Sequence, residues 1–374
     1  MQNRSNIKKL REEVTELYYF YQDLHSSPNK DLLRKSHLEA KFNNDSISLQ
    51  ETLRLYKKLK DHFKEPAILQ IDKIKPIMVN VDGDSLMKSL YKIARQTWSM
   101  PFNKGYGRRL RYVVYDEFHE SVIGIIGLQS PPADLACRDN LFDFSNVNKL
   151  DMINRTMDIF SLGSIPPYSA ILGGKLVAGL AGSKTICKDY KEKYANHQTL
   201  IEQKELSNDL VALTTTSAFG KSSIYNRLKF KDKLIAEPIG YTKGFGNLHL
   251  ESIYPRLIEL LKEHDLYTAG GYGNGPKQRW QNMTRALHLL NLPNSYSRHG
   301  VHREVYLYRL RASLEEGMAG GKFGKKIALS EKEYSKYWLD RWAKPRALRN
   351  TDWQLMSTES YILNALGSKA NSSQ

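Results

Sequence analysis

Cysteine and long apolar runs are both scarce in this chain. Among its 374 residues only Cys137 and Cys187 are cysteines, and they show no C-x-x-C spacing. Two such residues do not make a disulfide framework or a cysteine-ligated zinc site. No apolar run approaches the ~20 residues that a membrane-spanning helix needs, and the first residues lack the apolar stretch of a signal peptide. We therefore expect a soluble protein of the reducing cytoplasm, without membrane association.

Acidic residues are also few relative to basic residues. The chain has 56 lysines and arginines against 40 aspartates and glutamates, and its formal net charge is +16. Hydrophobic residues make up 41% of the sequence, which indicates a folded core rather than a disordered chain. A surface of this charge favours polyanions, so DNA or RNA is an expected partner. An ordinary basic surface without such a partner would give the same composition.

Apolar spacing divides the chain into three expected parts. Residues 1–70 hold two amphipathic helices, near 6–25 and 48–59, that we expect to pack as a helical hairpin. Residues 71–250 alternate strands and helices and form an α/β core, and residues 251–374 form a basic, mostly helical C-terminal region. Residues 184–208 are expected to be an exposed lysine-rich arm, and residues 317–326 a flexible basic linker.

The order of elements in the core resembles the acetyltransferase fold of the GNAT type. It runs strand, helix, two strands, strand, glycine-containing helix, strand, helix and strand. The resemblance implies a mixed sheet in which one strand splays from its neighbour, and a gap there that admits acetyl-CoA, with the pyrophosphate at the N-terminus of the next helix. Gly173, Gly174 and Lys175 begin the helix at that place. The GNAT pyrophosphate loop is absent, so an acyl-CoA-dependent acyltransferase is kept as the alternative function.

A hydroxyl-rich stretch after the apolar run 210–213 is the best candidate for a ligand site. It contains Thr215, Thr216, Ser217, Gly220, Lys221 and Ser222. Gly220-Lys221-Ser222 resembles the end of a P-loop, whose backbone N–H groups cradle phosphates. Thr215 replaces the first glycine of that motif and resists its tight turn, so an NTPase is disfavoured. Together with Gly173, Gly174 and Lys175, the stretch forms a candidate cofactor site whose ligand is unknown.

Basic and aromatic residues alternate in the C-terminal part, which suits phosphate contacts combined with base stacking. The candidate nucleic-acid residues are Lys277, Arg279, Trp280, Arg285, Arg298 and Arg303. The alternative is that the aromatics belong to the core and the arginines solvate the surface. His299 and His302 lack a completing ligand set, so no metal site is predicted. No catalytic residue is identified from the sequence.

Five runs resemble a narrower family, the DruA proteins of bacterial Druantia anti-phage defence systems. They are residues 166–168 (PPY), 172–176 (LGGKL), 214–218 (TTTSA), 222–228 (SSIYNRL) and 299–306 (HGVHREVY). The resemblance covers roughly residues 75–345. It implies a role in antiviral defence beside other subunits, including a helicase-like protein, through binding of nucleic acid or of those subunits. It transfers no catalytic residue, and whether the chain is an enzyme stays open.

Overall fold

The chain is a mixed α/β protein built around one large sheet. The computed structural model describes residues 2–26, 30–44, 46–100, 105–198, 203–205, 207–218, 220–244, 248–270 and 278–367. Between residues 76 and 309 strands alternate with helices, as the sequence predicts for its core, and the described residues before and after this part contain helices without strands. No helix of the described ranges has both the length and the apolar character that a bilayer span requires.

The described strands form a seven-stranded sheet in the order β1-β2-β3-β4-β5-β9-β8. Neighbours run antiparallel, except β4 and β5, which are parallel. A separate two-stranded hairpin consists of β6 and β7. The strands are β1 (Pro76–Asn80), β2 (Arg109–Asp116), β3 (Ser121–Gln129), β4 (Thr156–Ser164), β5 (Ala212–Thr216), β6 (Lys229–Phe230), β7 (Lys233–Leu234), β8 (Glu237–Tyr241) and β9 (Glu304–Arg309).

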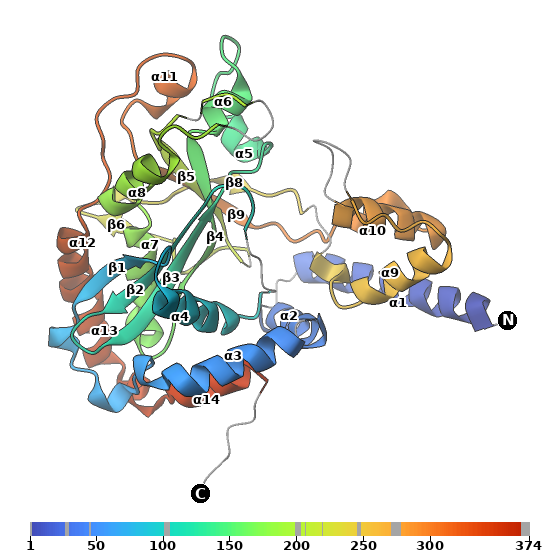
Figure 1. The fold of residues 1–374 in the computed structure, drawn as a ribbon, viewed down its shortest axis with the longest axis horizontal. Helices are drawn as coiled ribbons and strands as arrows, with labels where there is room; N and C mark the ends of the chain where they lie inside the picture. The colour runs from blue at the N-terminus through green and yellow to red at the C-terminus, as the bar shows by residue number, and fades with distance from the viewer. Residues whose placement is uncertain are drawn as a thin grey trace, which may run out of the picture.

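Helices cover both faces of the sheet (Figure 1). The longer helices are α1 (Gln2–Ser26), α2 (Lys30–Asn44), α3 (Ser46–Leu59), α4 (Ser85–Gln96), α7 (Gly173–Leu180), α8 (Lys184–Tyr194), α9 (Tyr254–Glu263), α10 (Gln278–Leu289), α12 (Glu331–Trp338) and α14 (Thr358–Ala365). The shorter ones are α5 (Ala136–Asp139), α6 (Lys149–Ile153), α11 (Leu314–Met318) and α13 (Lys344–Arg349), and a π-helical turn, Leu339–Ala343, joins α12 to α13.

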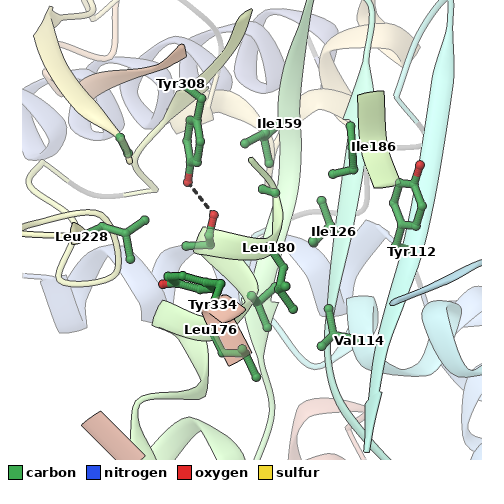
Figure 2. Packing of buried hydrophobic residues seen from close by; sticks show 14 of the residues in the cluster. Tyr112, Val114, Ile126, Ile159, Leu176, Leu180, Ile186, Leu228, Tyr308 and Tyr334 are labelled. Atoms are coloured by element: carbon green, nitrogen blue, oxygen red, sulfur yellow. Dashed lines mark hydrogen bonds between the residues drawn. The ribbon is translucent and has the colours of Figure 1, made fainter. Parts of the chain in front are cut away.

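The strand β3, which lies inside the sheet between β2 and β4, explains why both faces are covered. Its sequence, SVIGIIGLQ, is apolar on both sides, and all of its residues are buried. One face packs against α7 and α8 through residues such as Leu176 and Ile186 (Figure 2). The other packs against α3, α4 and α14, where Leu90 and Ile362 are fully buried. A strand with two apolar faces is stable only inside such a three-layer arrangement.

Aromatic side chains fix α7 between the sheet and α12. The hydroxyl of Tyr308 donates to the carbonyl of Ala178 at 3.0 Å (Figure 2). Tyr334 donates to the carbonyl of Lys175 at 2.8 Å. Because each buried ring has a partner for its polar atom, it contributes its large apolar area without leaving an unsatisfied group.

The helix α14 is held at both ends by side chains from distant parts of the chain. The carboxylate of Glu65 accepts the backbone N–H groups of Thr358 at 2.9 Å and Glu359 at 2.8 Å. At the other end the ammonium of the buried Lys41 donates to the carbonyl of Ala365 at 2.8 Å. A negative group at a helix N-terminus and a positive group at its C-terminus both complement the helix dipole.

The N-terminal helices have different partners from those of the expected hairpin. Leu10 and Val14 of α1 share a hydrophobic cluster with Leu257 of α9 and Leu287 of α10. The helix α3 packs instead against α4. Because β9 lies between β5 and β8, the sheet also includes residues well beyond 250.

One segment expected to be an exposed arm and one expected to be a flexible linker are packed against the protein instead, so both expectations are wrong. Residues 184–194 of the expected arm form α8, whose Ile186, Tyr190 and Tyr194 are buried at helical spacing. The other side of α8 carries lysines. Because these lysines dominate the composition of the segment, the apolar stripe of Ile186, Tyr190 and Tyr194 was not recognised in the sequence. The expected linker 317–326 is folded back by backbone hydrogen bonds, such as the one from Gly324 N–H to the Ala312 carbonyl at 2.8 Å.

The substitution Gly179→Ala tests the packing of α7 against α12. A Cβ atom at position 179 would lie 1.9 Å from Cζ of Tyr334, so the ring would have to move. Overpacking of this kind costs about 1–3 kcal/mol. We expect the free energy of unfolding, measured by urea denaturation, to fall by that amount. In the control Gly270→Ala the new Cβ meets nothing within 4 Å, and the change should stay below about 0.5 kcal/mol. Equal stabilities of the two variants would contradict this packing.

Candidate functional site

The first turn of α7, predicted to hold a cofactor phosphate, is covered by the protein itself. A Cβ atom added at Gly174 would lie 3.2 Å from Cγ1 of Ile224, so the chain after β5 packs directly on this turn. The ammonium of Lys175 donates to the carbonyls of Ser223, Ile224 and Asn226 at 3.3, 3.3 and 2.9 Å. Burial lowers the pKa of Lys175. Gly173, which precedes Gly174 in the chain, is buried against Tyr168.

The hydroxyl-rich stretch after β5 uses most of its polar groups locally. The hydroxyl of Ser217 donates to the carbonyl of Gly220, which has a positive φ of 52°. Ser222 accepts the N–H of Ile224 at 3.2 Å, while Thr216 is half-buried and Lys221 is exposed. The exception is Thr215, whose side chain lies at the boundary between β4 and β5.

The strands β4 and β5 part immediately beyond Thr215. Their parallel pairing comprises four residue pairs, from Thr156 with Ala212 to Ile159 with Thr215. Beyond these pairs β4 continues along β3 alone, as far as Ser164. The hydroxyl of Thr215 donates to the carbonyl of Ile159 at 3.1 Å, and the Tyr225 hydroxyl lies 3.3 Å from it. Polar groups therefore gather where the two strands separate.

Asp158 is the charged group at this position. Gln129 Nε2 donates to its Oδ2 at 3.2 Å, and the hydroxyl of Thr214 donates to its Oδ1 at 3.0 Å, so three adjacent strands contribute. Burial raises the pKa of Asp158 to about 6. The two hydrogen bonds and the positive charges of Arg138 and Arg303 act in the opposite direction but do not outweigh burial. A carboxyl group that changes its charge near neutral pH in a buried setting is typical of functional sites.

Arg303 approaches Asp158 from the start of β9. Burial lowers the pKa of this guanidinium, and the negative charge of Asp158 opposes that change. The charge of Arg303 also adds to burial in lowering the pKa of His37 to about 4. Yet Arg303 forms no salt bridge with Asp158, and its buried Nε has no hydrogen-bond partner among the described residues. The sequence predicted Arg303 as a contact to nucleic acid; its side chain is half-buried, and its Nε is shielded from solvent.

The other residues predicted to contact nucleic acid lie apart from Arg303, mostly on α10. Arg279 forms a salt bridge with Glu251 and lies 4.0 Å from the ring centroid of Tyr254. Arg285 donates to the hydroxyl of Thr268 at 2.6 Å. Trp280 is 43% exposed. Arg298 follows the turn after α10, where its backbone carbonyl accepts Gln22 Nε2 at 3.2 Å, and Lys277 lies outside the described residues.

A different group of basic side chains projects from the two-stranded hairpin of β6 and β7. We call residues 227–233 the basic hairpin; its exposed cations are Arg227, Lys229, Lys231 and Lys233. None of these four forms a salt bridge with a residue that the structure describes. Asp232 is its only acidic residue. The hairpin packs on α12 through Phe230, whose ring centroid lies 5.8 Å from that of Tyr334. Figure 1 shows β6 beside α12 at the outer side of the sheet.

A buried Asp–His pair elsewhere has the composition of a catalytic dyad but a structural role. Asp116 accepts hydrogen bonds from His119 Nδ1 at 2.6 Å, from the hydroxyl of Tyr168 at 2.9 Å and from the backbone. The second ring nitrogen of His119, Nε2, accepts the N–H of Gln70 at 3.0 Å. Because both ring nitrogens are engaged, His119 has none left to act as a general base.

Fold and site define a class: an α/β protein with a mixed seven-stranded sheet, in which the carboxyl group of Asp158 lies beside the point where the two parallel strands part. The family model described as Druantia protein DruA matches residues 27–320. The curated Druantia protein DruA of Escherichia coli (strain UMEA 4076-1) is 35% identical over 361 residues, which cover 93% of this chain and 88% of that protein. The chain therefore belongs to the DruA family, and the resemblance seen in the five sequence runs is confirmed. No solved structure matches it.

The substitution Asp158→Asn tests the raised pKa. A carboxyl whose pKa is about 6 in the folded chain, above its ordinary 3.8, holds its proton more tightly when folded. The wild type therefore loses stability as the pH rises from about 4 to 6, and the loss levels off above that range. The variant has no such proton. Relative to the wild type, its free energy of unfolding should therefore increase by up to about 3 kcal/mol over this range. Urea denaturation at a series of pH values measures the difference.

The control for that experiment is Asp143→Asn. Asp143 is exposed, and hydrogen bonds from Ser145 lower its pKa. The expected effect of pH is therefore the opposite. As the pH rises, the free energy of unfolding of this variant should decrease relative to that of the wild type. A stability difference between Asp158→Asn and the wild type that stays constant across the range would contradict the raised pKa.

Proposed function

We propose that this chain is a subunit of a Druantia-type anti-phage defence system in the bacterial cytoplasm, and that it contacts nucleic acid there. Membership of the DruA family supports the defence role. It also supports other subunits of the system as partners, among them the helicase-like protein that the family resemblance implies. The observation that carries the nucleic-acid part is the basic hairpin, whose four exposed cations have no salt bridge to any described residue to offset them.

The distribution of charge favours the basic hairpin over the arginines of α10. An arginine that already has a carboxylate partner, such as Arg279, must give up that contact before it can bind a phosphate. Lys229, Lys231 and Lys233 have no such contact to break within the described ranges, so they can neutralise phosphates and release the counterions that drive binding. The net charge of +16 adds a long-range attraction of the same sign.

The order of the sheet supports a GNAT-like core, without acyl transfer. One parallel pair that parts in the middle of a mixed sheet is the arrangement expected of that fold, and the chain shows it at β4 and β5. In the GNAT resemblance the pyrophosphate of acetyl-CoA would lie at the N-terminus of α7. Ile224 and the carbonyls held by Lys175 occupy that position here. We therefore propose nucleic-acid contact rather than acyl-CoA chemistry.

A salt titration of nucleic-acid binding tests the proposal. We expect fluorescence anisotropy to show binding to duplex or single-stranded DNA or RNA at low salt, with log affinity falling linearly with log salt. The triple variant Lys229→Gln, Lys231→Gln and Lys233→Gln removes three cations from the basic hairpin. For each phosphate that the variant no longer neutralises, the slope should be shallower by about 0.9 on duplex, or about 0.7 on a single strand.

The matched control removes the same charge from another exposed place. Lys322, Lys325 and Lys326 are exposed and lie in the loop after α11. Their triple replacement by glutamine lowers the net charge equally, and we expect a much smaller change in slope. Equal effects of the two triple variants would show that only net charge counts. Absence of binding by the wild type at low salt would refute the nucleic-acid part of the proposal.

A further inference from the structure

Four large apolar side chains are exposed around α13, on the side of the protein away from α9 and α10 (Figure 1). Leu348 of α13 is 82% exposed and Leu355 is 87% exposed. Ile68 and Met356 are exposed as well. We call these four residues the apolar patch. Single exposed apolar residues are ordinary on a protein surface, but a group of them at one place is typical of a surface that a partner covers.

Short elements in mutual contact bring the apolar patch together. The 3-10 turn Thr351–Leu355 follows α13, and Trp353 in this turn donates from Nε1 to the carbonyl of Ala347 at 3.3 Å. The same turn contacts the 3-10 turn Pro66–Ile68. Leu348 adjoins Ala347, and two other members of the patch end or follow the turn that holds Trp353. The patch is therefore one surface built from two distant parts of the chain.

The inner side of these elements is already used by the core. Trp353 and Ala343 are buried in the main hydrophobic cluster, and Ala347 packs against it. The carboxylate of Glu65, which precedes the turn Pro66–Ile68, holds the start of α14. The fold thus accounts for the inward side chains of this region. It gives no packing role to Leu348 or to Leu355.

Cations without a carboxylate partner lie beside the patch on α13. Lys344 forms salt bridges with Asp72 at 2.9 Å and with Asp340 at 3.2 Å. Arg346 and Arg349 of the same helix form no salt bridge with a described residue. Their Nε atoms donate to backbone carbonyls instead, at 3.5 and 3.0 Å. Two of the three cations of α13 therefore keep charge that no described carboxylate offsets.

A third such cation, Lys73, lies on the neighbouring 3-10 turn Ile71–Lys73, which contacts α13. Its ammonium is 5.9 Å from the ring centroid of the exposed Phe118, and it has no salt bridge to a described residue. Between residues 344 and 356 the sequence has one acidic residue, Asp352. The patch thus combines an apolar surface with a positive rim.

The charge of the rim argues against three occupants. A symmetric contact with a second copy would place the same positive rim against itself. Residues 368–374 of the chain, SKANSSQ, contain neither an acidic nor a large apolar residue that would match the patch. An anionic bilayer is usually bound through clusters of about four to eight lysines and arginines, more than the rim provides. A protein segment that carries both apolar residues and carboxylates fits the surface.

We propose that the apolar patch is the docking surface for an apolar, acidic segment of another subunit of the same system. Apolar side chains of that segment cover Leu348 and Leu355, and burial of these two residues supplies most of the affinity. Its carboxylates pair with Arg346, Arg349 and Lys73, which sets the orientation of the segment and its choice of partner more than its affinity. The assignment of the segment to a subunit rests on the proposed function, whereas the chemistry of the surface does not.

Selection from a displayed library of random peptides tests the surface with the full chain. The library presents peptides of about 16 residues, long enough for an amphipathic helix or an extended segment. We expect peptides selected on the wild type to combine apolar residues with an excess of acidic over basic ones. The affinity of a selected synthetic peptide, measured by fluorescence anisotropy, should fall at least about tenfold in the double variant Leu348→Ser with Leu355→Ser.

Two further double variants complete the test. Lys73→Gln with Arg349→Gln should weaken the same peptide by about threefold and make its binding less sensitive to salt. The control Leu150→Ser with Leu266→Ser removes exposed leucines elsewhere and should leave the affinity unchanged. Because Leu348 and Leu355 are exposed, their double serine variant should unfold at the same urea concentration as the wild type, so its lost binding does not come from unfolding.

Other outcomes would overturn the docking surface. A selection without binders, binders that are not acidic, or binders that retain full affinity for the double serine variant would each refute it. Sedimentation with phosphatidylcholine vesicles that contain about a quarter phosphatidylserine, abolished in that variant, would assign the patch to a membrane. Light scattering that shows a dimer, dissociated by the same variant, would assign it to a second copy.

The result is separable from the proposed function. If acidic peptides bind the patch while the wild type binds no DNA or RNA at low salt, the nucleic-acid part fails and the docking surface stands. If nucleic acid binds and no peptide does, the docking surface alone is refuted. A peptide consensus that matches no segment of the other proteins of the system would refute the assignment to a subunit.

Discussion

The parallel pairing of β4 with β5 is the constraint on which the rest of the fold depends. Parallel neighbours cannot be joined by a tight turn, so the chain between them must cross one face of the sheet. The helices α7 and α8 make that crossing and bring the aromatic residues of α12 onto the same face. Since only four residue pairs hold the two strands together, the sheet opens beyond them. The polar side chains at this opening, such as Asp158 and Thr215, therefore lie there because of the strand topology as well as the local sequence.

Two kinds of buried charge coexist around this sheet. In the first, every polar atom is matched, as for Asp116 with its backbone and side-chain donors or Lys41 with its ring of carbonyls. In the second, represented by Arg303 and Asp158, each charge acts on the pKa of the other group although the two form no salt bridge.

The sequence predicted those elements whose apolar residues follow a regular period. The helix near 6–25 and the strands of the core belong to this group, and the structure contains them. The sequence analysis missed α2 because the inward side of this helix carries His37 and Lys41, which leave no apolar stripe. The packing of α1 against α9 and α10 was also not predicted. Periodicity shows which side of a helix is apolar, but it does not show which distant element covers that side.

The candidate site was less accessible to sequence reasoning than the fold. Thr215 and Arg303 were singled out for reasons unrelated to their contacts, the former in a hydroxyl-rich run and the latter in a basic one. Asp158 and Gln129 were not singled out, although an aspartate inside the apolar run of β4 is a usable signal. The site combines side chains separated by up to about 170 positions in the chain, from the end of β3 to the start of β9. Only the register of the strands brings them together.

The two charged side chains that hold α14 have a consequence for the architecture as a whole. Glu65 and Lys41 belong to the first fifth of the sequence, and α14 is its last described helix. The layer on that face is therefore completed only when α14 has been synthesised and has docked beside α3. Until α14 has docked, the ammonium of Lys41 and the carboxylate of Glu65 must stay hydrated, so this face of the sheet closes later than the face covered by α7 and α8.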